Sequence, residues 1–178
     1  MIYLVRHGET DDNKNHIIQG NKPMNKTGKK QVKETAKILK DIEFDVCFCS
    51  PLKRTRQTAK SLLKYHRNLK IFYDDRLIER QYGEMVGLCY DTIPNYSKIR
   101  WNANEKFVES AEQVLDFYDR IADFYDDILS RCKGKNILIV AHSGVARMTY
   151  FYFNGKPKDN DFTNFRIKNA HIMQIENE

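Results

Sequence analysis

Residues 137–144 read ILIVAHSG, and this stretch decides the predicted fold. Its first five residues, from Ile137 to Ala141, are all apolar, which is typical of a strand covered on both faces. Such a strand belongs to the middle of a mostly parallel sheet, because only a sheet with helices on both sides hides both of its faces. The polar residues His142 and Ser143 follow at once, so the strand leads directly into residues that carry chemistry.

Strand-like and helix-like segments alternate along the rest of the chain. Short apolar runs at 2–5, 44–49 and 69–73 predict strands, and residues 167–175 alternate as a closing strand should. Apolar residues recur at helical spacing in 29–39, which Asn25 can cap, and in 52–63, 110–132 and 145–153. This order predicts an α/β fold, a three-layer α/β/α sandwich with a mostly parallel central sheet.

The size of the chain favours one domain. With 178 residues, 41% of them hydrophobic, it predicts a single domain over 1–178. Residues 74–109 show no sustained period and contain Gly83, Gly87 and Pro94, so we expect an irregular segment that covers a substrate site. No apolar run approaches the roughly 20 residues that span a bilayer, and no signal-peptide layout precedes Arg6. A cytoplasmic protein with no membrane partner is predicted.

Charge and cysteine content exclude two other classes of function. The formal net charge is +6, but acidic residues lie between the basic ones and no tract mixes basic with aromatic residues, which argues against a nucleic-acid partner. The cysteines lack paired spacing, so structural roles are predicted rather than a disulfide or a zinc site. These cysteines are Cys47, Cys49, Cys89 and Cys132.

Two predicted strands end in the same way, each with a histidine beside glycine. His7 follows the strand at 2–5, and His142 follows the strand at 137–141. Ligands of open α/β sheets bind at the carboxyl ends of the strands, so we expect the two histidines to converge there. The remaining histidines, His16, His66 and His171, have no such setting and are predicted to serve surface or packing roles.

Cationic groups are predicted at the same edge of the sheet. Arg6 adjoins His7, and Arg54 begins the helix after the strand at 44–49, whereas Arg56 points away from that edge. A guanidinium offers a planar fork to phosphate oxygens. The backbone N–H groups at Ser143, where a helix opens, also favour an anion. Together these residues predict a phosphate pocket.

Four motifs, in order along nearly the whole chain, resemble those of the histidine phosphatase superfamily, the phosphoglycerate mutase-like family. They are 6–10 (RHGET) with Asn13, 50–59 (SPLKRTRQTA), 77–83 (LIERQYG) and 140–144 (VAHSG). The resemblance implies a phosphoglycerate mutase-like fold and an enzyme that needs no metal and no cofactor. Ser143 departs from the family pattern, which commonly has a second glycine there, and keeps the backbone donor while adding a hydroxyl.

The resemblance implies a role for each residue in the pocket. His7 is the nucleophile that becomes phosphorylated, and Arg6, Arg54 and His142 surround the phosphoryl group with help from Asn13. A neutral imidazole is a suitable nucleophile near neutral pH, and the cations offset the charge in transfer. The leaving alkoxide needs a proton from a carboxylic acid. Spacing alone leaves Glu9, Glu79 and Glu84 open for this role, and the resemblance favours Glu79.

The segment after Glu79 bears on the choice between phosphatase and mutase. It resembles the mutase form of its motif, in which Arg80 and Tyr82 help to hold substrate. The mutases, however, are longer, whereas this chain has only 85–108 before its long helix. Within that stretch Lys98, Arg100 and Trp101 could touch a substrate, but loop surface for the two cations and a packed aromatic for Trp101 are favoured.

A phosphatase that hydrolyses a small phosphomonoester of a phosphorylated metabolite is therefore predicted. A phosphoglycerate mutase-type transferase and a non-catalytic binding protein on the same fold are the alternatives. Neither the substrate nor the oligomeric state follows from the sequence.

Overall fold

The computed structural model describes residues 1–18 and 20–176. Five strands form one sheet in the order β3-β2-β4-β1-β5, with β1, β2, β3 and β4 parallel and β5 antiparallel to β1. The strands are β1 (Ile2–Arg6), β2 (Val46–Cys49), β3 (Ile71–Tyr73), β4 (Ile137–Ala141) and β5 (Ile172–Ile175). The longer helices are α2 (Lys26–Leu39), α3 (Lys53–Leu62), α5 (Val114–Arg131) and α6 (Ser143–Asn154). This arrangement confirms the predicted α/β class and the mostly parallel sheet.

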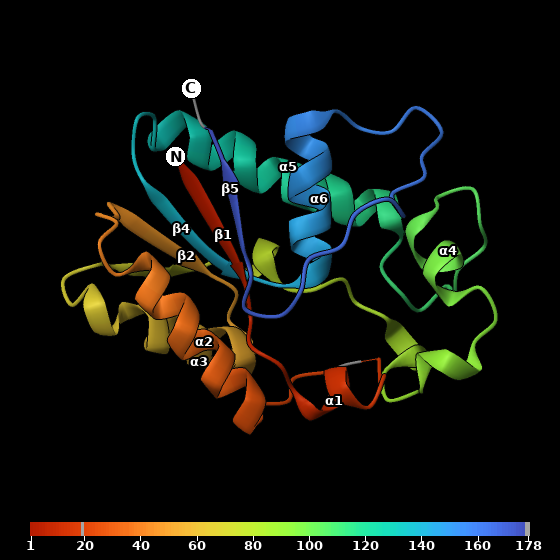
Figure 1. Ribbon diagram of the computed structural model, residues 1–178. Coiled ribbons are helices and arrows are strands. Elements are labelled where there is room, and N and C mark those ends of the chain that lie inside the picture. Colours follow the sequence, from red (N-terminus) through yellow and green to blue (C-terminus); the bar gives the residue numbers. More distant parts are fainter. Residues whose placement is uncertain (19, 177–178) are drawn as a thin grey trace.

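Helices cover both faces of the sheet, as Figure 1 shows. Alternate residues of β4 pack on opposite sides: Ile137 and Ile139 join the core with α5 and α6, whereas Leu138 and Val140 join the core with α2 and α3. All five residues of β4 are fully buried, because successive side chains of a strand point to opposite faces and each face here has a helical layer. The sandwich therefore has three layers, with β4 at its centre.

The helices overlap their predicted segments, although α5 begins at Val114 where the sequence predicts a start at 110. Asn25 caps α2, because its side-chain oxygen accepts a 2.8 Å hydrogen bond from the backbone N–H of Gly28. In α5 Phe117, Ile121 and Phe124 are fully buried and belong to the face that packs against the sheet. Each fully buried side chain of this size stabilises the fold by roughly 1.5–3 kcal/mol relative to exposure.

Residues 74–113 connect β3 to α5 without a strand. They contain the short helices η2 (Asp75–Leu77), η3 (Gly83–Met85), η4 (Tyr90–Thr92) and α4 (Tyr96–Trp101). A further 3₁₀ turn, η1 (Leu63–Tyr65), extends α3, and α1 (Asp11–Lys14) follows the loop after β1. In Figure 1 α1 and the green segment with α4 lie at one end of the molecule, away from the N-terminus of β1. This is the end to which the parallel strands deliver their last residues.

The closing strand is shorter than predicted. Residues 167–171 are not part of β5, because Ala170 adopts a left-handed φ of 57° and its N–H donates to the carbonyl oxygens of Arg6 and His7. The segment thus crosses the end of β1 instead of pairing along it. Within residues 1–18 and 20–176 no helix is both long enough and apolar enough to cross a membrane. The four cysteines are free thiols, and Cys47 and Cys49 lie in the same core cluster.

Candidate active site

The ends of the three central strands bring the predicted histidines together. The N–H of His7, directly after β1, donates to the carbonyl oxygen of Ala141 at 2.9 Å, and the N–H of Ser50, directly after β2, donates to that of Val140 at 3.0 Å. His142 follows β4. The rings of His7 and His142 lie with centroids 5.2 Å apart, and both are fully buried. The predicted convergence of the two histidines is present in the structure.

The hydrogen bonding of His7 fixes which nitrogen can react. Nδ1 lies 2.7 Å from the carbonyl oxygen of Gly8, and because a carbonyl oxygen only accepts, Nδ1 must carry the proton. Nε2 is buried and has no hydrogen-bond partner among the described residues. In the neutral ring this nitrogen holds the lone pair, so His7 presents a nucleophilic atom without needing a separate base.

Two arginines flank the histidines and keep donors unpaired. Nη1 of Arg54 donates to the carbonyl oxygen of Gly20 at 2.6 Å, and Nη1 of Arg6 donates to that of Ile167 at 2.7 Å. Nε and Nη2 of Arg54 and Nε of Arg6 are buried with no partner in the described part of the chain. Each guanidinium is therefore held at one corner while its remaining donors stay available to phosphate oxygens.

His142 is held by the residue that ends β2. Its Nε2 lies 2.8 Å from Oγ of Ser50, while Nδ1 is buried and finds no partner among residues 1–18 and 20–176. When the Ser50 hydroxyl donates this bond, the proton of the neutral ring sits on Nδ1. His142 can then act as one more donor toward a phosphate oxygen.

Glu79 is the only one of the three candidate acids that lines the cavity at this end of the sheet. It is 7% exposed, and its carboxylate accepts hydrogen bonds from the backbone N–H of Arg80 at 2.9 Å and of Gly144 at 3.1 Å. Glu9 instead accepts from Asn25, which orders the loop after His7, and Glu84 is exposed. The geometry thus favours Glu79 as the proton donor.

Burial and like charges keep both histidines neutral. The pKa of His7 lies well below its ordinary value, because burial first and then the positive charges of Arg54 and Arg6 disfavour the imidazolium. Burial, followed by the charge of Arg54, lowers the pKa of His142 in the same way. Burial also lowers the pKa of Arg6 and of Arg54 to about 10, so both remain charged at neutral pH.

These shifts predict that stability is lost as the pH falls. Below about pH 6.5 the unfolded chain protonates His7 and His142, whereas the folded chain does not, so the unfolded state binds more protons. The free energy of unfolding should then drop by about 1.4 kcal/mol per pH unit for each histidine. Urea unfolding of the wild type and of the variant H7A/H142A between pH 7 and pH 5 measures this. If the free energy of unfolding depended on pH equally in both proteins, the prediction would be contradicted.

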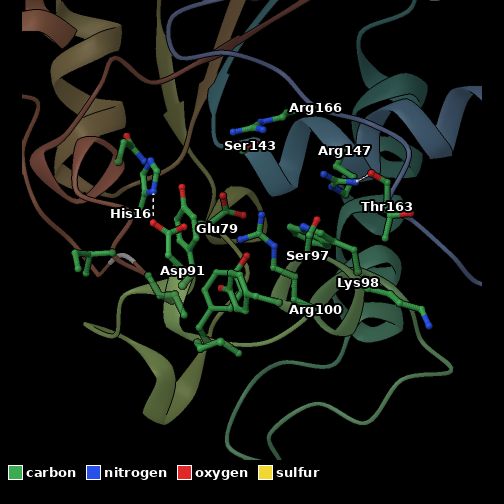
Figure 2. A pocket seen from close by; sticks show the side chains of 18 of the residues that line it. His16, Glu79, Asp91, Ser97, Lys98, Arg100, Ser143, Arg147, Thr163 and Arg166 are labelled. Atoms are coloured by element: carbon green, nitrogen blue, oxygen red, sulfur yellow. Dashed lines mark hydrogen bonds and ion pairs between the residues drawn. The ribbon is translucent and has the colours of Figure 1, made fainter.

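A cavity of about 700 Å³ opens from this centre toward α4. Asn13, Ser143 and Tyr82, predicted to contact substrate, line it together with Arg6 and Glu79. Figure 2 shows Glu79 and Ser143 on its wall. His7, Arg54 and His142 are fully buried next to these lining residues, so a phosphoryl group reaches them only after a small displacement of the lining side chains.

Arg80 does not line the cavity in the structure, so its predicted contact with substrate stays a prediction. Its Nε donates to the carbonyl oxygen of Glu112 at 2.7 Å, its Nη1 donates to that of Arg100, and its guanidinium lies over the ring of Phe107 at 4.7 Å. These bonds tie three loop segments together. Arg80 thus shapes the wall of the cavity instead of reaching into it, because backbone carbonyls and an aromatic ring occupy its guanidinium.

Several lining residues were not predicted from the sequence. Arg100, expected to be loop surface, lines the cavity, and so do Arg147 and Arg166, while Trp101 is packed as expected. Arg147 lies four residues after Ser143 in α6, a helical spacing that could have revealed it. His16 also lines the cavity, where it pairs with Asp91 at 2.6 Å; His66 and His171 have packing and surface positions.

Gly144 controls the position of the acid. A Cβ on Gly144 would lie 2.1 Å from Oε1 of Glu79 and 2.9 Å from ring atoms of Trp101 and Phe117, so the carboxylate must move. Since a misplacement of about 1 Å can cost 100-fold in rate, we expect Gly144→Ala to lower kcat by about 100-fold. Steady-state kinetics with a circular dichroism check of folding tests this. An unchanged kcat would mean that the present carboxylate position is not needed.

No group of three or more His, Cys, Asp or Glu side chains suited to hold a metal ion occurs in the described part of the chain. The chemistry derived from the site uses side-chain nitrogens, the carboxylate of Glu79 and backbone donors.

Comparison with known proteins identifies the family. The model of the histidine phosphatase superfamily (branch 1) matches residues 2–178. The uncharacterized phosphatase PhoE of Bacillus subtilis (strain 168) is 31% identical over 98% of this chain and 87% of its own. The fructose-2,6-bisphosphatase TIGAR of Bos taurus is 36% identical over 65% of this chain and 45% of its own. The structure of Bacillus stearothermophilus YhfR superposes with a TM-score of 0.86 at 24% identity, over 96% of this chain and 88% of that one. The chain belongs to the histidine phosphatase superfamily.

Proposed function

We propose that this phosphatase hydrolyses a small phosphomonoester in two steps, through a phosphohistidine on Nε2 of His7. The observation that carries the proposal is the 2.7 Å contact between Nδ1 of His7 and the Gly8 carbonyl oxygen, which assigns the proton to Nδ1 and leaves Nε2 buried without a partner among the described residues. Arg54 and Arg6 lie close enough to act electrostatically on this ring. The names of the two relatives described above, both of them phosphatases, support hydrolysis as the reaction. A small phosphorylated metabolite is the partner; the cytoplasmic location stays a prediction.

In the first step the lone pair of Nε2 attacks phosphorus, and the bond from phosphorus to the ester oxygen breaks. Arg6, Arg54 and Nδ1–H of His142 donate to the phosphoryl oxygens, whose charge is greatest during transfer. Glu79 gives its proton to the leaving oxygen, so an alcohol departs. The imidazole ring, now phosphorylated on Nε2, keeps the proton on Nδ1.

In the second step a water molecule attacks the phosphohistidine. The Glu79 carboxylate takes a proton from the water, and the bond between Nε2 and phosphorus breaks with its electron pair returning to nitrogen. Inorganic phosphate leaves, and both His7 and Glu79 are back in their starting forms. One carboxyl group thus serves as acid and then as base.

We propose that 1–178 act as one catalytic unit and that the segment 74–109 covers the substrate. Support comes from Tyr82 and residues of α4 and η4 on the cavity wall, opposite Asn13 and Ser143. In this proposal Asn13, Ser143 and Tyr82 contact the substrate. The short stretch 85–108 favours hydrolysis over a mutase, because a mutase must keep water away from its phosphohistidine.

The proposal is tested by two assays on one preparation of the protein. Release of inorganic phosphate is followed across a panel of phosphorylated sugars and carboxylic acids, and interconversion of phosphoglycerates is followed in parallel. We expect phosphate release from at least one ester and acid-labile label on the protein during turnover. Interconversion without phosphate release would establish the mutase instead, and neither activity would favour a binding protein on this fold.

A further inference from the structure

Three arginines line the cavity without a carboxylate partner. Arg100 comes from α4, Arg147 from α6, and Arg166 from the segment before β5. None of the three forms an ion pair with any residue in 1–18 or 20–176, although other cations of the region do: Lys98 pairs with Glu105 at 2.6 Å. Figure 2 shows the three side chains around the cavity, which Glu79 and Ser143 also line.

The acids of this cavity are already engaged elsewhere. Glu79 accepts from two backbone N–H groups, and Asp91 pairs with His16 at 2.6 Å. The arginines are also close enough to repel one another, since Arg100 and Arg166 both act to lower the pKa of Arg147 and of Arg6 after the larger effect of burial. Glu79 offsets part of this repulsion, because it acts to raise the pKa of Arg100, Arg147 and Arg6. One carboxylate does not balance the charges of several arginines, so the cavity favours an anion.

Packing holds two of these arginines in place. The guanidinium of Arg100 lies over the rings of Tyr96, at 4.6 Å, and Trp101, at 5.1 Å. Arg147 lies over the same Trp101 ring at 4.6 Å and donates to the carbonyl oxygens of Phe162 and Thr163. Such contacts position a cation without neutralising it. Arg166 is exposed at the cavity wall, and its side chain has no hydrogen bond to the part of the chain that the structure describes.

We propose that the substrate carries a second anionic group, a carboxylate or a phosphate, which Arg100 and Arg166 bind with Arg147 behind them. This inference rests on the proposed function, because it assumes that the first phosphate lies at His7. It narrows the substrate class from any small phosphomonoester to one with an anion at its other end. Hydrogen bonds between charged groups are shorter and stronger than neutral ones, so the second anion contributes to specificity.

Matched pairs of esters test the proposal. The pair 3-phosphoglycerate and glycerol 3-phosphate differs by a carboxylate against a hydroxymethyl group, and fructose 1,6-bisphosphate against fructose 6-phosphate differs by a second phosphate. In at least one pair, we expect kcat/KM to be at least about tenfold higher for the ester that carries the second anionic group. The pair that shows the preference identifies the second group. A ratio near one in both pairs overturns the proposal.

Variants that remove arginine charges test whether Arg100 and Arg166 cause this substrate preference. The variant R100Q/R166Q should lower the preferred ratio at least about fivefold, whereas Arg67→Gln, which removes an exposed charge elsewhere, should leave it unchanged. Because Arg100 packs on aromatic rings, folding of the double variant is checked by circular dichroism, and Arg166→Gln alone gives the test at an exposed position. A ratio that survives both Arg166→Gln and the double variant overturns the proposal.

Binding can be measured without turnover, because the chain has one tryptophan. Trp101 is 2% exposed and lies against Arg100 and Arg147, so an anion held there should change its fluorescence. In the variant His7→Ala we expect 3-phosphoglycerate or fructose 1,6-bisphosphate to saturate this change at a lower concentration than its singly anionic match. Selective binding by His7→Ala together with no phosphate release by the wild type from any ester would refute hydrolysis and keep the second anion site. Phosphate release by the wild type without selective binding by His7→Ala would overturn the second anion site and keep hydrolysis.

Discussion

Replacement of His7 by alanine is expected to lower phosphate release at least about 10⁴-fold and to abolish phosphorylation of the protein. The expected loss is this large because the variant lacks the atom that forms the covalent intermediate. Folding should survive, since the ring makes one hydrogen bond, to the adjacent Gly8 carbonyl. Incubation with a labelled phosphodonor, followed by denaturation under alkaline conditions, measures the intermediate directly.

The matched control is His171→Ala, which removes an exposed histidine whose side chain lies outside the cavity. Wild-type labelling and turnover are expected for this variant. Equal labelling of the wild type and His7→Ala would remove His7 as the nucleophile. Loss of the folded circular dichroism spectrum in His7→Ala would instead show that the imidazole is needed for packing.

The sequence predicts most of the fold because burial leaves a local pattern. The run from Ile137 to Ala141 has no polar residue, and this follows from the helical layers on both faces of β4. The order of the strands in the sheet has no such local signal, since it depends on which strands pair with each other through hydrogen bonds. Residues 167–171 show the same limit, because their alternation is that of a strand while Ala170 bonds across the end of β1.

The sequence likewise predicts some residues of the site better than others. His7 and His142 could be predicted because each follows a strand directly, and parallel strands end at one edge of a sheet. For Arg100 the sequence leaves substrate contact and loop surface open, because α4 is one short helix in a segment without a period and the position of Arg100 depends on Tyr96 and Trp101. For Arg80 the resemblance suggests a substrate contact, whereas in the structure its Nε and Nη1 donate to loop carbonyl oxygens.

The charges of the pocket oppose folding as well as serving catalysis. Arg54 is fully buried, and burial lowers its pKa from 12.5 to about 10, which corresponds to roughly 3 kcal/mol against the charged form in the folded protein. Its side chain makes one bond, to the carbonyl oxygen of Gly20, while two of its nitrogens remain unpaired. Active sites commonly retain such groups at a cost in stability.

Arg54→Met separates the two effects. Methionine fills much of the same volume without charge, so we expect relief of the buried charge to offset loss of the Gly20 bond, leaving the free energy of unfolding within about 2 kcal/mol of wild type. Phosphoryl transfer should fall about 10³-fold, because a donor to the transferring group is lost. Urea unfolding and kcat/KM for the best substrate measure the two quantities on the same protein.

A third measurement on Arg54→Met links these effects to His7. Arg54 is the charge that most strongly lowers the pKa of His7, after burial, so its removal should raise that pKa toward its ordinary value. The sign is fixed, because loss of a neighbouring positive charge always favours the imidazolium. Proton NMR of the histidine rings across pH 4 to 8 follows the change, with His142 expected to shift in the same direction. Unshifted ring titrations beside a full loss of activity would place Arg54 too far from His7 for the proposed pocket.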